Sequence, residues 1–514
     1  MAASASPETP TRPSRRAGWH VAGGIAAWAF PLVTSIVAMP LLWRALGRDG
    51  FGVYVLAAGY AALAGSFGTI RGAAQRASAA AASPTRAALP AALGGAYLAA
   101  LATGVATLVA ATLLAPVFLR MAGIDPATDP SALAAFRLAG AAAPAAHLAQ
   151  AARGILLGLE RYGAYSAHVA ATAVVASIGT VLLAQAGHRA PGLMLWLVVS
   201  NVLSAAAGIT LALVTSRGPH PTRSWADGWA ILRFGATLLA TDAILNLYLV
   251  AERTVLTRAV GVSAVAEYTI PLSLASALQN ALAAGAVVLL PRAGAAWALG
   301  DHAALRATYA RAVKVVTLVA LGGSTAVAGA AALLVGWWIE PAFGVQTAGV
   351  IAVLLAAYAV NALATPMWYL AEGAGMPARN TALSAGVAIV GISCGLVLAP
   401  SSGALGVAWA RSLAMLSVPA FVLLGERAIL GQGQSALWAA VVTRVVPAGL
   451  VLIAAVYMAQ RELSGIGLLL VDALLLVAYA AWLWRSSFFE ADERRAIARL
   501  IGTSRSQPPR SDGA

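Results

Sequence analysis

Long runs of residues without a charge follow one another along almost the whole chain. One of them, from Asn380 to Ala410, contains no Asp, Glu, Lys or Arg, and only 10% of the 514 residues are charged whereas 60% are hydrophobic. A soluble domain carries roughly 25% charged residues, so this chain has too few charges to cover a surface exposed to water. We therefore expect lipid to be the solvent for most of the chain.

These uncharged runs have the length of membrane-spanning helices. A span needs about 20 mostly apolar residues, so fourteen spans with short connections fill the chain and leave no stretch for a sizeable soluble domain. Twelve spans are expected in Ala17–Trp43, Phe51–Ile70, Ala87–Leu119, Ser131–Leu159, Tyr162–Gly187, Ala190–Ser216, Trp229–Leu256, Val265–Leu290, Val315–Ile339, Val345–Ala371, Ala436–Gln460 and Ser464–Trp484. The other two lie between Asn380 and Leu424 and are separated by the turn residues Pro400–Gly403.

The distribution of basic residues sets the expected topology. With both termini in the cytoplasm, 22 of the 33 Lys and Arg residues lie on the inner side and 7 on the outer side. Basic residues are known to collect on cytoplasmic loops, so this orientation is favoured. It also accounts for the net charge of +14, and nucleic acid is therefore not expected as a partner.

A short signature occurs twice, each time at a junction between two expected spans. Its two copies, 214 residues apart, are Arg44-Gly47-Tyr54 and Arg258-Gly261-Tyr268. Related halves with a binding site between them are a common transporter plan. The sequence therefore predicts an all-α polytopic membrane protein with two six-helix bundles related by pseudo-twofold symmetry, followed by a C-terminal helix pair.

The expected domain boundaries follow from these spans. They are a cytoplasmic N-terminal tail (1–19), the first bundle (20–215), a cytoplasmic linker (216–228), the second bundle (229–425), the extra helix pair (436–485) and a cytoplasmic tail (486–514).

Several short segments resemble those of the polysaccharide-transport family of oligosaccharide flippases. This family shares the multidrug/oligosaccharidyl-lipid/polysaccharide exporter superfamily with the multidrug and toxin extrusion antiporters. The segments are Leu46–Tyr54, Gly158–Tyr162, Ala251–Arg253, Pro291–Arg292, Gly373–Gly375 and Gly403–Ala410. None is specific alone, and their order over roughly residues 20–485 carries the resemblance. The family often has an acidic residue late in span two, but Ser66–Ile70 has none, so ion coupling is not expected there.

The resemblance implies a flippase for undecaprenyl-diphosphate-linked oligosaccharide in a bacterial inner membrane. It would serve the biosynthesis of a cell-surface polysaccharide, such as lipopolysaccharide or exopolysaccharide, by alternating access through a basic central cavity. The expected partners are a polyprenyl-diphosphate-linked oligosaccharide, membrane lipid, a proton or sodium ion, and a polysaccharide polymerase and glycosyltransferases. No cofactor, metal or catalytic residue is expected, since none of the six histidines pairs with a carboxylate or cysteine at metal-ligand spacing.

Two other functions stay open at this point. One is a multidrug or small-molecule antiporter of the same superfamily. The other is a membrane polysaccharide polymerase or glycosyltransferase, which usually carries a long outer loop with catalytic residues. The longest expected outer loop, Arg120–Pro130, is short for that purpose.

Arginines within or beside the spans are the candidate substrate-binding residues. An intramembrane charge costs roughly 2.5–3.5 kcal/mol on insertion scales and usually faces a cavity or a partner. Arg137 in span four and Arg411 in span twelve are candidates for the diphosphate, because a guanidinium stays charged and donates two hydrogen bonds at once. Structural pairing with an acidic residue is the alternative. Arg71 and Arg76, at the inner end of span two, either meet the head group at entry or anchor the span.

A polar stripe on span seven is the candidate for ion coupling. Asp242 and Asn246 are four residues apart and therefore share a helix face. Asp242 is the candidate for proton or sodium coupling and Asn246 for substrate binding, with an interhelical hydrogen bond as the alternative. For Arg444 and Asp472, in the extra helix pair, we expect a structural role.

Overall fold

Helices make up the fold of the residues that the structure describes. The structure is a computed structural model and describes residues 15–82, 86–216 and 220–500. Within these ranges the regular elements are α-helices and two short π-helices, with no strand, which confirms the predicted all-α class. The predicted N-terminal tail up to residue 14, Arg217 in the predicted linker and residues 501–514 of the predicted C-terminal tail lie outside the described residues.

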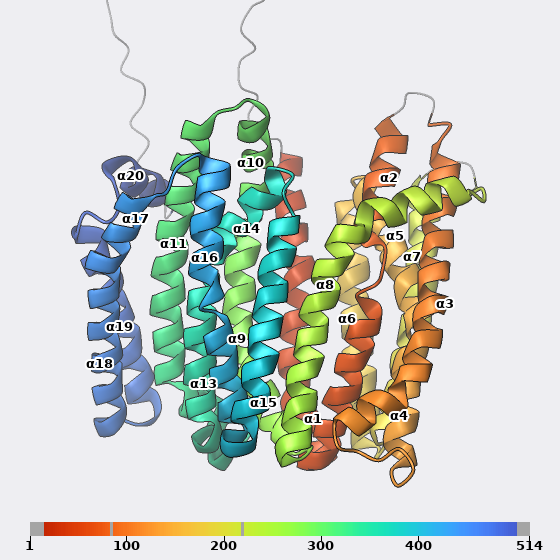
Figure 1. The fold of residues 1–514 in the computed structure, drawn as a ribbon, viewed down its shortest axis with the longest axis horizontal. Helices are drawn as coiled ribbons and strands as arrows, with labels where there is room; N and C mark the ends of the chain where they lie inside the picture. The colour runs from red at the N-terminus through yellow and green to blue at the C-terminus, as the bar shows by residue number, and fades with distance from the viewer. Residues whose placement is uncertain (1–14, 83–85, 217–219, 501–514) are drawn as a thin grey trace, which may run out of the picture. The chain divides into compact units, whose positions relative to one another are not determined.

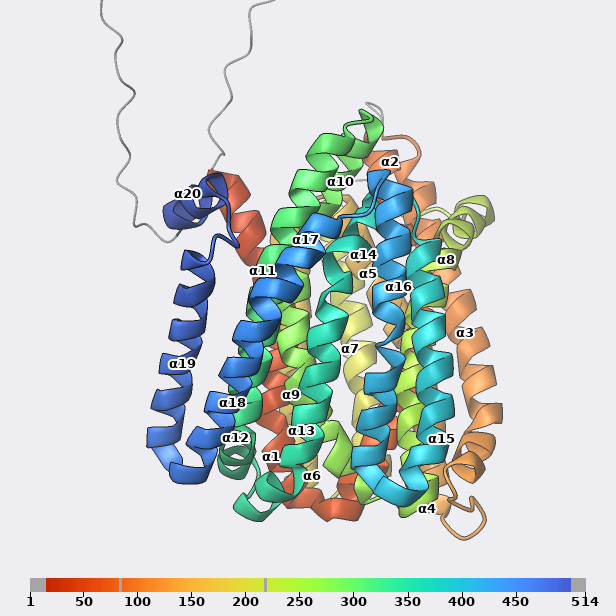
Figure 2. The ribbon, with the colours of Figure 1, turned by 60° about the vertical axis from the view of Figure 1, so that its left-hand side comes forward.

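The helices form two compact units, Met1–Ala266 and Glu267–Ala514 (Figures 1 and 2). The first unit contains α1 (Arg15–Gly65), α2 (Ile70–Ala82), α3 (Leu89–Met121), α4 (Pro130–Ala141), α5 (Ala143–Gly158), α6 (Tyr162–Gln185), α7 (Ala190–Ser216) and α8 (Trp225–Val260). The predicted linker 216–228 includes the last residue of α7 and the first turn of α8, and it falls inside this unit. The division into two six-helix bundles stays a prediction.

The second unit begins within α9. Its helices are α9 (Ala264–Ala286), α10 (Leu289–Ala298), α11 (His302–Gly329), α12 (Ala331–Trp338), α13 (Pro341–Ala362), α14 (Ala364–Gly373), α15 (Ala378–Ala414), α16 (Ser417–Gly425), η1 (Glu426–Leu430), α17 (Ser435–Ala440), η2 (Val441–Val445), α18 (Val446–Glu462), α19 (Gly465–Arg485) and α20 (Ala491–Leu500). The helices α18 and α19, shown in blue in Figure 2, lie side by side, and both pack against α11.

The number of separate spanning helices differs from the expected fourteen. Among the described residues, ten helices are long and apolar enough to cross a membrane, or up to twelve if each of two bent pairs is one span. Two of the ten, Phe30–Ala82 and Ala378–Leu430, cover 53 residues each. Each is far longer than the about 20 residues of one span. Non-helical backbone interrupts each of them, at Gly47 or at Gly403, and the count of fourteen stays a prediction.

The two glycines of the repeated signature share one unusual backbone conformation. Gly47 has φ 68° and ψ 177°, and Gly261 has φ 123° and ψ 167°. This region of positive φ and extended ψ is essentially restricted to glycine. A Cβ at either position would meet nothing within 4 Å, so backbone geometry alone explains why both copies carry glycine.

Candidate functional site

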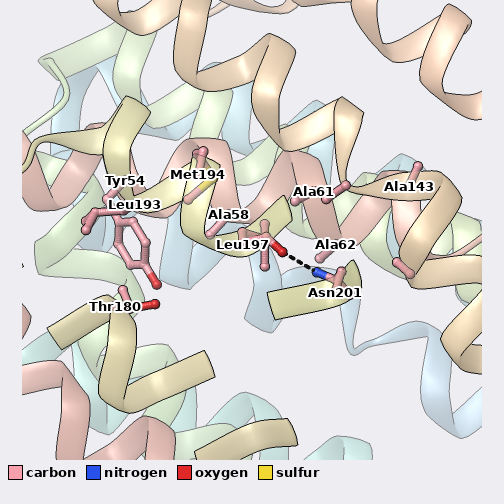
Figure 3. A pocket seen from close by; sticks show the side chains of 12 residues that line it. Tyr54, Ala58, Ala61, Ala62, Ala143, Thr180, Leu193, Met194, Leu197 and Asn201 are labelled. Atoms are coloured by element: carbon pink, nitrogen blue, oxygen red, sulfur yellow. Dashed lines mark hydrogen bonds between the residues drawn. The ribbon is translucent and has the colours of Figure 1, made fainter. Parts of the chain in front are cut away.

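A neutral pocket of about 250 Å³ lies within the first unit. Alanines of α1 and α5 form much of its wall, and Tyr54, Thr180 and Asn201 supply its polar side chains. Figure 3 shows the hydroxyls of Tyr54 and Thr180 pointing toward one another, whereas the Asn201 amide donates to the carbonyl of Leu197 at 2.8 Å. We call this cavity the alanine-lined pocket. Because no charged residue lines it, it suits an uncharged, largely apolar group.

A short non-helical segment, which we call the break, separates α1 from α2. Helix α1 ends at Gly65 and α2 begins at Ile70, so carbonyls near the end of α1 lose their helical partners. In lipid such groups must be satisfied by the protein itself. His147 Nε2 lies 3.0 Å from the carbonyl oxygen of Ala64, and Gln150 Nε2 donates to that of Gly65 at 2.9 Å. Both side chains come from α5, and they stabilise the break.

Gly68 leaves room for Gln150 within this break. A Cβ at Gly68 would overlap the side-chain amide of Gln150, which would have to move to make room for it. His147 is fully buried, and its Nδ1 lies 3.0 Å from the hydroxyl of Thr103. No role was predicted for His147 from the sequence, because it does not have metal-ligand spacing. In the structure, its contacts hold the non-helical segment between α1 and α2 in place.

A second pocket, with a volume of about 10 Å³, lies at this break. It is lined by Gly68–Gly72 at the start of α2 and by Ile231, Gly235, Leu239 and Asp242 of α8. Helix α8 is itself bent here, since the segments Trp225–Ala236 and Leu239–Val260 meet at 58°. Two interrupted helices therefore face one pocket, which we call the break pocket. Discontinuous helices of this kind form the substrate and ion sites of many transporters.

The break pocket brings together two of the predicted site residues, Arg71 and Asp242. Arg71 is exposed, Asp242 is half-buried, and the charge of the guanidinium acts on the carboxylate. Thr69 is only 3% exposed, and its hydroxyl has no hydrogen-bond partner among the described residues. The first amide groups of α2 add donors, because the N-terminal turn of a helix leaves them without intrahelical partners.

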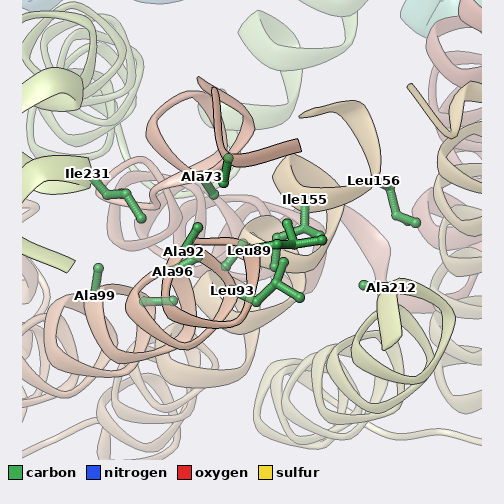
Figure 4. Packing of buried hydrophobic residues seen from close by; sticks show 13 residues of the cluster. Ala73, Leu89, Ala92, Leu93, Ala96, Ala99, Ile155, Leu156, Ala212 and Ile231 are labelled. Carbon is green, nitrogen blue, oxygen red and sulfur yellow. The ribbon is translucent and has the colours of Figure 1, made fainter. Parts of the chain in front are cut away.

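Close packing fixes the start of α2. Gly154 and Gly158 of α5 are one turn apart, and a Cβ on either would overlap a carbonyl oxygen of α2, that of Ile70 or that of Ala74. Small residues with this spacing let helix backbones approach closely in lipid. Figure 4 shows the buried side chains around this contact, in which Ala73 of α2 belongs to one cluster with Ile155 of α5.

Arg76 and Asn246 make local structural contacts. Arg76 forms an ion pair with Asp227 in the first turn of α8, whose start is also held by the hydroxyl of Ser224. Arg76 therefore ties α2 to α8, in line with the anchoring alternative. The Asn246 side-chain amide donates a hydrogen bond to the main-chain oxygen of Asp242 at 2.9 Å. This hydrogen bond lies within α8 and does not involve the side-chain carboxylate of Asp242.

The other predicted arginines have different environments. Arg137 lies on α4 in the first unit with its side chain exposed. Arg411 lies on α15 in the second unit, is 5% exposed, and donates to the hydroxyls of Tyr268 at 3.1 Å and Tyr358 at 3.3 Å. Its guanidinium also lies 5.6 Å from the ring centre of Tyr358. The shared cavity expected for Arg137 and Arg411 stays a prediction.

A buried carboxylate that the sequence did not single out lies in the second unit. Glu426 of η1 is fully buried. It accepts hydrogen bonds from the hydroxyl of Tyr309 at 3.0 Å, the indole N–H of Trp438 at 2.7 Å and the backbone N–H of Gln434 at 2.8 Å. These donors come from α11 and from the segment that leads into α18. Glu426 therefore holds the start of the extra helix pair. Arg444, which donates to the carbonyl of Ser487 at 2.6 Å, makes a similar contact at the end of that pair.

Solved transporter structures share this fold. An inward-facing multidrug resistance MATE family transporter of the MOP superfamily matches with TM-score 0.64 and 15% identity, over 81% of this chain and 99% of that chain. The lipid II flippase MurJ, in an inward closed conformation, matches with TM-score 0.70 and 10% identity, over 92% and 100%. A MOP superfamily transporter from Pyrococcus furiosus Vc1 matches with TM-score 0.54 and 15% identity, over 80% and 96%. At these identities the likeness shows the fold.

The sequence family is shown by a separate comparison. A comparison with curated proteins gave no match. The model of the family described as polysaccharide biosynthesis protein, however, matches residues 17–297, which is more than half of the chain. The chain therefore belongs to the polysaccharide biosynthesis protein family and has the multi-pass membrane fold of the MOP-superfamily transporters.

Proposed function

We propose that the chain is a flippase for lipid-linked oligosaccharide of the undecaprenyl-diphosphate type. The observation that carries this proposal is the break pocket, where Arg71 at the start of α2 shares one cavity with Asp242 of the bent helix α8. Family membership and a fold shared with a lipid II flippase support the same substrate class. The site of action is the bacterial inner membrane, with both termini in the cytoplasm.

The donors of the break pocket suit a diphosphate. A helix N-terminus favours an anion through its free amide groups and its dipole, and the guanidinium of Arg71 adds a charged, bidentate donor. The hydroxyl of Thr69, which is buried and has no hydrogen-bond partner in the part of the chain that the structure describes, adds a further donor. A sugar chain makes no comparable demand for positive charge, so we assign the diphosphate to this site. The pocket has a volume of only about 10 Å³ in the described structure, so α2 and α8 must move apart before a diphosphate enters it.

Asp242 supplies the coupling step in this proposal. In the described structure the charge of Arg71 acts on the Asp242 carboxylate. An incoming diphosphate competes with that carboxylate for the guanidinium. Asp242 then needs another cation, and binding of a proton or sodium ion supplies it. Alternating access follows if this exchange changes the angle at the bend of α8, which lies beside Asp242.

A second candidate function is a multidrug or small-molecule antiporter of the same superfamily. The alanine-lined pocket favours it, because a neutral cavity of about 250 Å³ with three polar side chains fits a small, weakly polar molecule better than a diphosphate. The likeness to MATE family transporters is compatible with this function. The two functions use different pockets of the first unit, so variants separate them.

Lipid analysis of a strain lacking the protein tests the proposal. Accumulation of polyprenyl-diphosphate oligosaccharide on the inner leaflet is expected, and Arg71→Ala should reproduce it at normal protein abundance. Arg71→Lys should rescue transport only in part, because an ammonium keeps the charge but loses the fork. Arg189→Ala, at an exposed arginine between α6 and α7, is the matched control. Unchanged lipids with lost drug resistance would instead establish the antiporter.

A further inference from the structure

Helix α19 carries one acidic residue within its length, Asp472. Its side chain is 3% exposed, and no hydrogen-bond donor among the described residues reaches either carboxylate oxygen. Asp472 is the eighth of the 21 residues of α19, well inside a candidate membrane span. A carboxylate at this position has no protein donor among the described residues to stabilise its charge.

The carboxyl group occupies a space left by a glycine. On α11, a Cβ added to Gly329 would lie 2.9 Å from Asp472 Oδ2. Seven residues further along α19, Tyr479 packs in the same way against Gly322, and its buried hydroxyl also lacks a hydrogen-bond partner among the described residues. Two polar residues a heptad apart therefore face two glycines a heptad apart. This register shows that both polar side chains belong to the packed interface between the two helices.

No basic side chain of the three packed helices is placed to balance Asp472. From α18, Gln460 donates to the carbonyl of Gly329 rather than to the carboxylate. Arg461, also on α18, is exposed and donates to Tyr457 at 2.7 Å. From α11, Lys314 forms ion pairs with Glu493 at 2.8 Å and Glu490 at 3.4 Å.

The remaining charged groups of these helices are four. Arg306 and Arg311 lie in the first half of α11, Glu462 is the last residue of α18, and Arg485 is the last residue of α19. Arg306 donates to the carbonyl of Leu430 at 3.2 Å, and Glu462 is exposed. The group that neutralises Asp472 must therefore come from outside these helices, and a proton is small enough to be held where Asp472 and Val456 both lie close to Gly329.

We propose that Asp472 is a proton-binding site that links proton uptake to the packing of α18 and α19 against α11. The carboxyl group is neutral while the three helices are packed as described. It transfers its proton to water, leaving a carboxylate, only when α19 separates from Gly329 and water enters. Burial of an unpaired charge is strongly unfavourable, so the ionised form opposes closure and the neutral form permits it.

This site is distinct from the coupling role proposed for Asp242. Asp242 lies in a pocket with Arg71, and the two side chains interact electrostatically. Asp472 lies in a packed interface where no hydrogen-bond donor of the described residues reaches it. Proton binding at Asp472 therefore controls the position of the C-terminal helix pair, whatever substrate the protein carries.

Infrared difference spectroscopy of the full chain in lipid tests the protonation state. The carbonyl stretching band of a protonated carboxylic acid should be present at neutral pH, shift in D2O, and lose intensity in Asp472→Asn. Asp492→Asn is the control, because that carboxylate is 80% exposed and its replacement should leave the band unchanged. Equal bands in the wild type and in Asp472→Asn would overturn the proposal.

Amide hydrogen exchange tests the link to packing. The wild type and Asp472→Asn are compared at the same pH. At alkaline pH, the amides of α18 and α19 should exchange faster in the wild type than in Asp472→Asn. At neutral pH, the two proteins should exchange at the same rate. If Asp472→Asn does not accumulate, Asp472→Leu replaces it, since it is also permanently neutral. The same exchange in wild type and variant at every pH would refute the link. Neither measurement involves transport, so its failure is distinguishable from failure of the proposed flippase activity.

Discussion

Replacing Gly154 by alanine tests whether the contact between α5 and α2 positions the break pocket. A Cβ at this position would overlap the carbonyl oxygen of Ile70 and come within 2.9 Å of Ala73 Cβ. Real Cβ contacts are essentially never this short, so α2 or α5 must move. Overpacking of this kind costs about 1–3 kcal/mol, whereas the change from glycine to alanine within a helix gains about 1 kcal/mol.

A matched control isolates the overlap. Gly349 lies within α13, is exposed, and a Cβ there would meet nothing within 4 Å. The helix-propensity gain is common to Gly154→Ala and Gly349→Ala, so it cancels in their difference. The free energy of unfolding of Gly154→Ala should therefore be lower than that of Gly349→Ala by about 1–3 kcal/mol, the overpacking cost.

The assay combines thermal unfolding of purified protein with export in cells. Gly154→Ala should unfold at a lower temperature than Gly349→Ala and should export less per molecule, because the overlap displaces Ile70 and with it the adjacent Arg71. Equal unfolding temperatures would refute the packing argument. A lower unfolding temperature with unchanged export would keep the packing but remove the link between this contact and transport.

Three further predictions concern the turns, the topology and the other arginines. Gly47→Ala and Gly261→Ala should each lower the unfolding temperature, since their backbone region costs a residue with a Cβ about 1–3 kcal/mol; unchanged temperatures would contradict this. Reporters fused between residues 217 and 227 and after Arg485 should both read cytoplasmic, and an outward reading at either would break the predicted topology. Arg411→Ala should lower protein abundance, because two tyrosine hydroxyls lose a donor, whereas Arg137→Ala should lower export at normal abundance. Full export by both would remove both residues from the site.

The sequence predicted the helical membrane fold well because lipid imposes a strong constraint. Runs of about 20 apolar residues have few alternatives in a membrane, so most residues of the predicted segments are helical along the described chain. Gly47 and Gly403, where non-helical backbone interrupts the helices, lie at span junctions that the sequence predicted. The break between Gly65 and Ile70 was not predicted, because it falls within the apolar run Phe51–Ile70 and apolar composition gives no measure of such a break.

The candidate site was predicted only in part. Arg71 and Asp242 were each singled out by charge, but their meeting in one pocket depends on the break before α2 and the bend in α8. Neither interruption has a proline. The break depends instead on His147 and Gln150, whose partners lie more than 80 residues away in sequence. Residue spacing in a sequence indicates only contacts between residues close together in the chain. It therefore could not predict the role of His147 or Gln150.

The repeated signature shows which part of a motif predicts structure. Gly47 and Gly261 adopt the same glycine-specific backbone region. The tyrosines that follow have different roles: Tyr54 lines the alanine-lined pocket, whereas Tyr268 is fully buried and accepts a hydrogen bond from Arg411. A turn is determined by its own few residues, but the partner of a side chain is determined by whichever distant helix packs against it. Matching motifs in this chain therefore support equivalent backbone turns, and the role of each side chain has to be established from its own contacts.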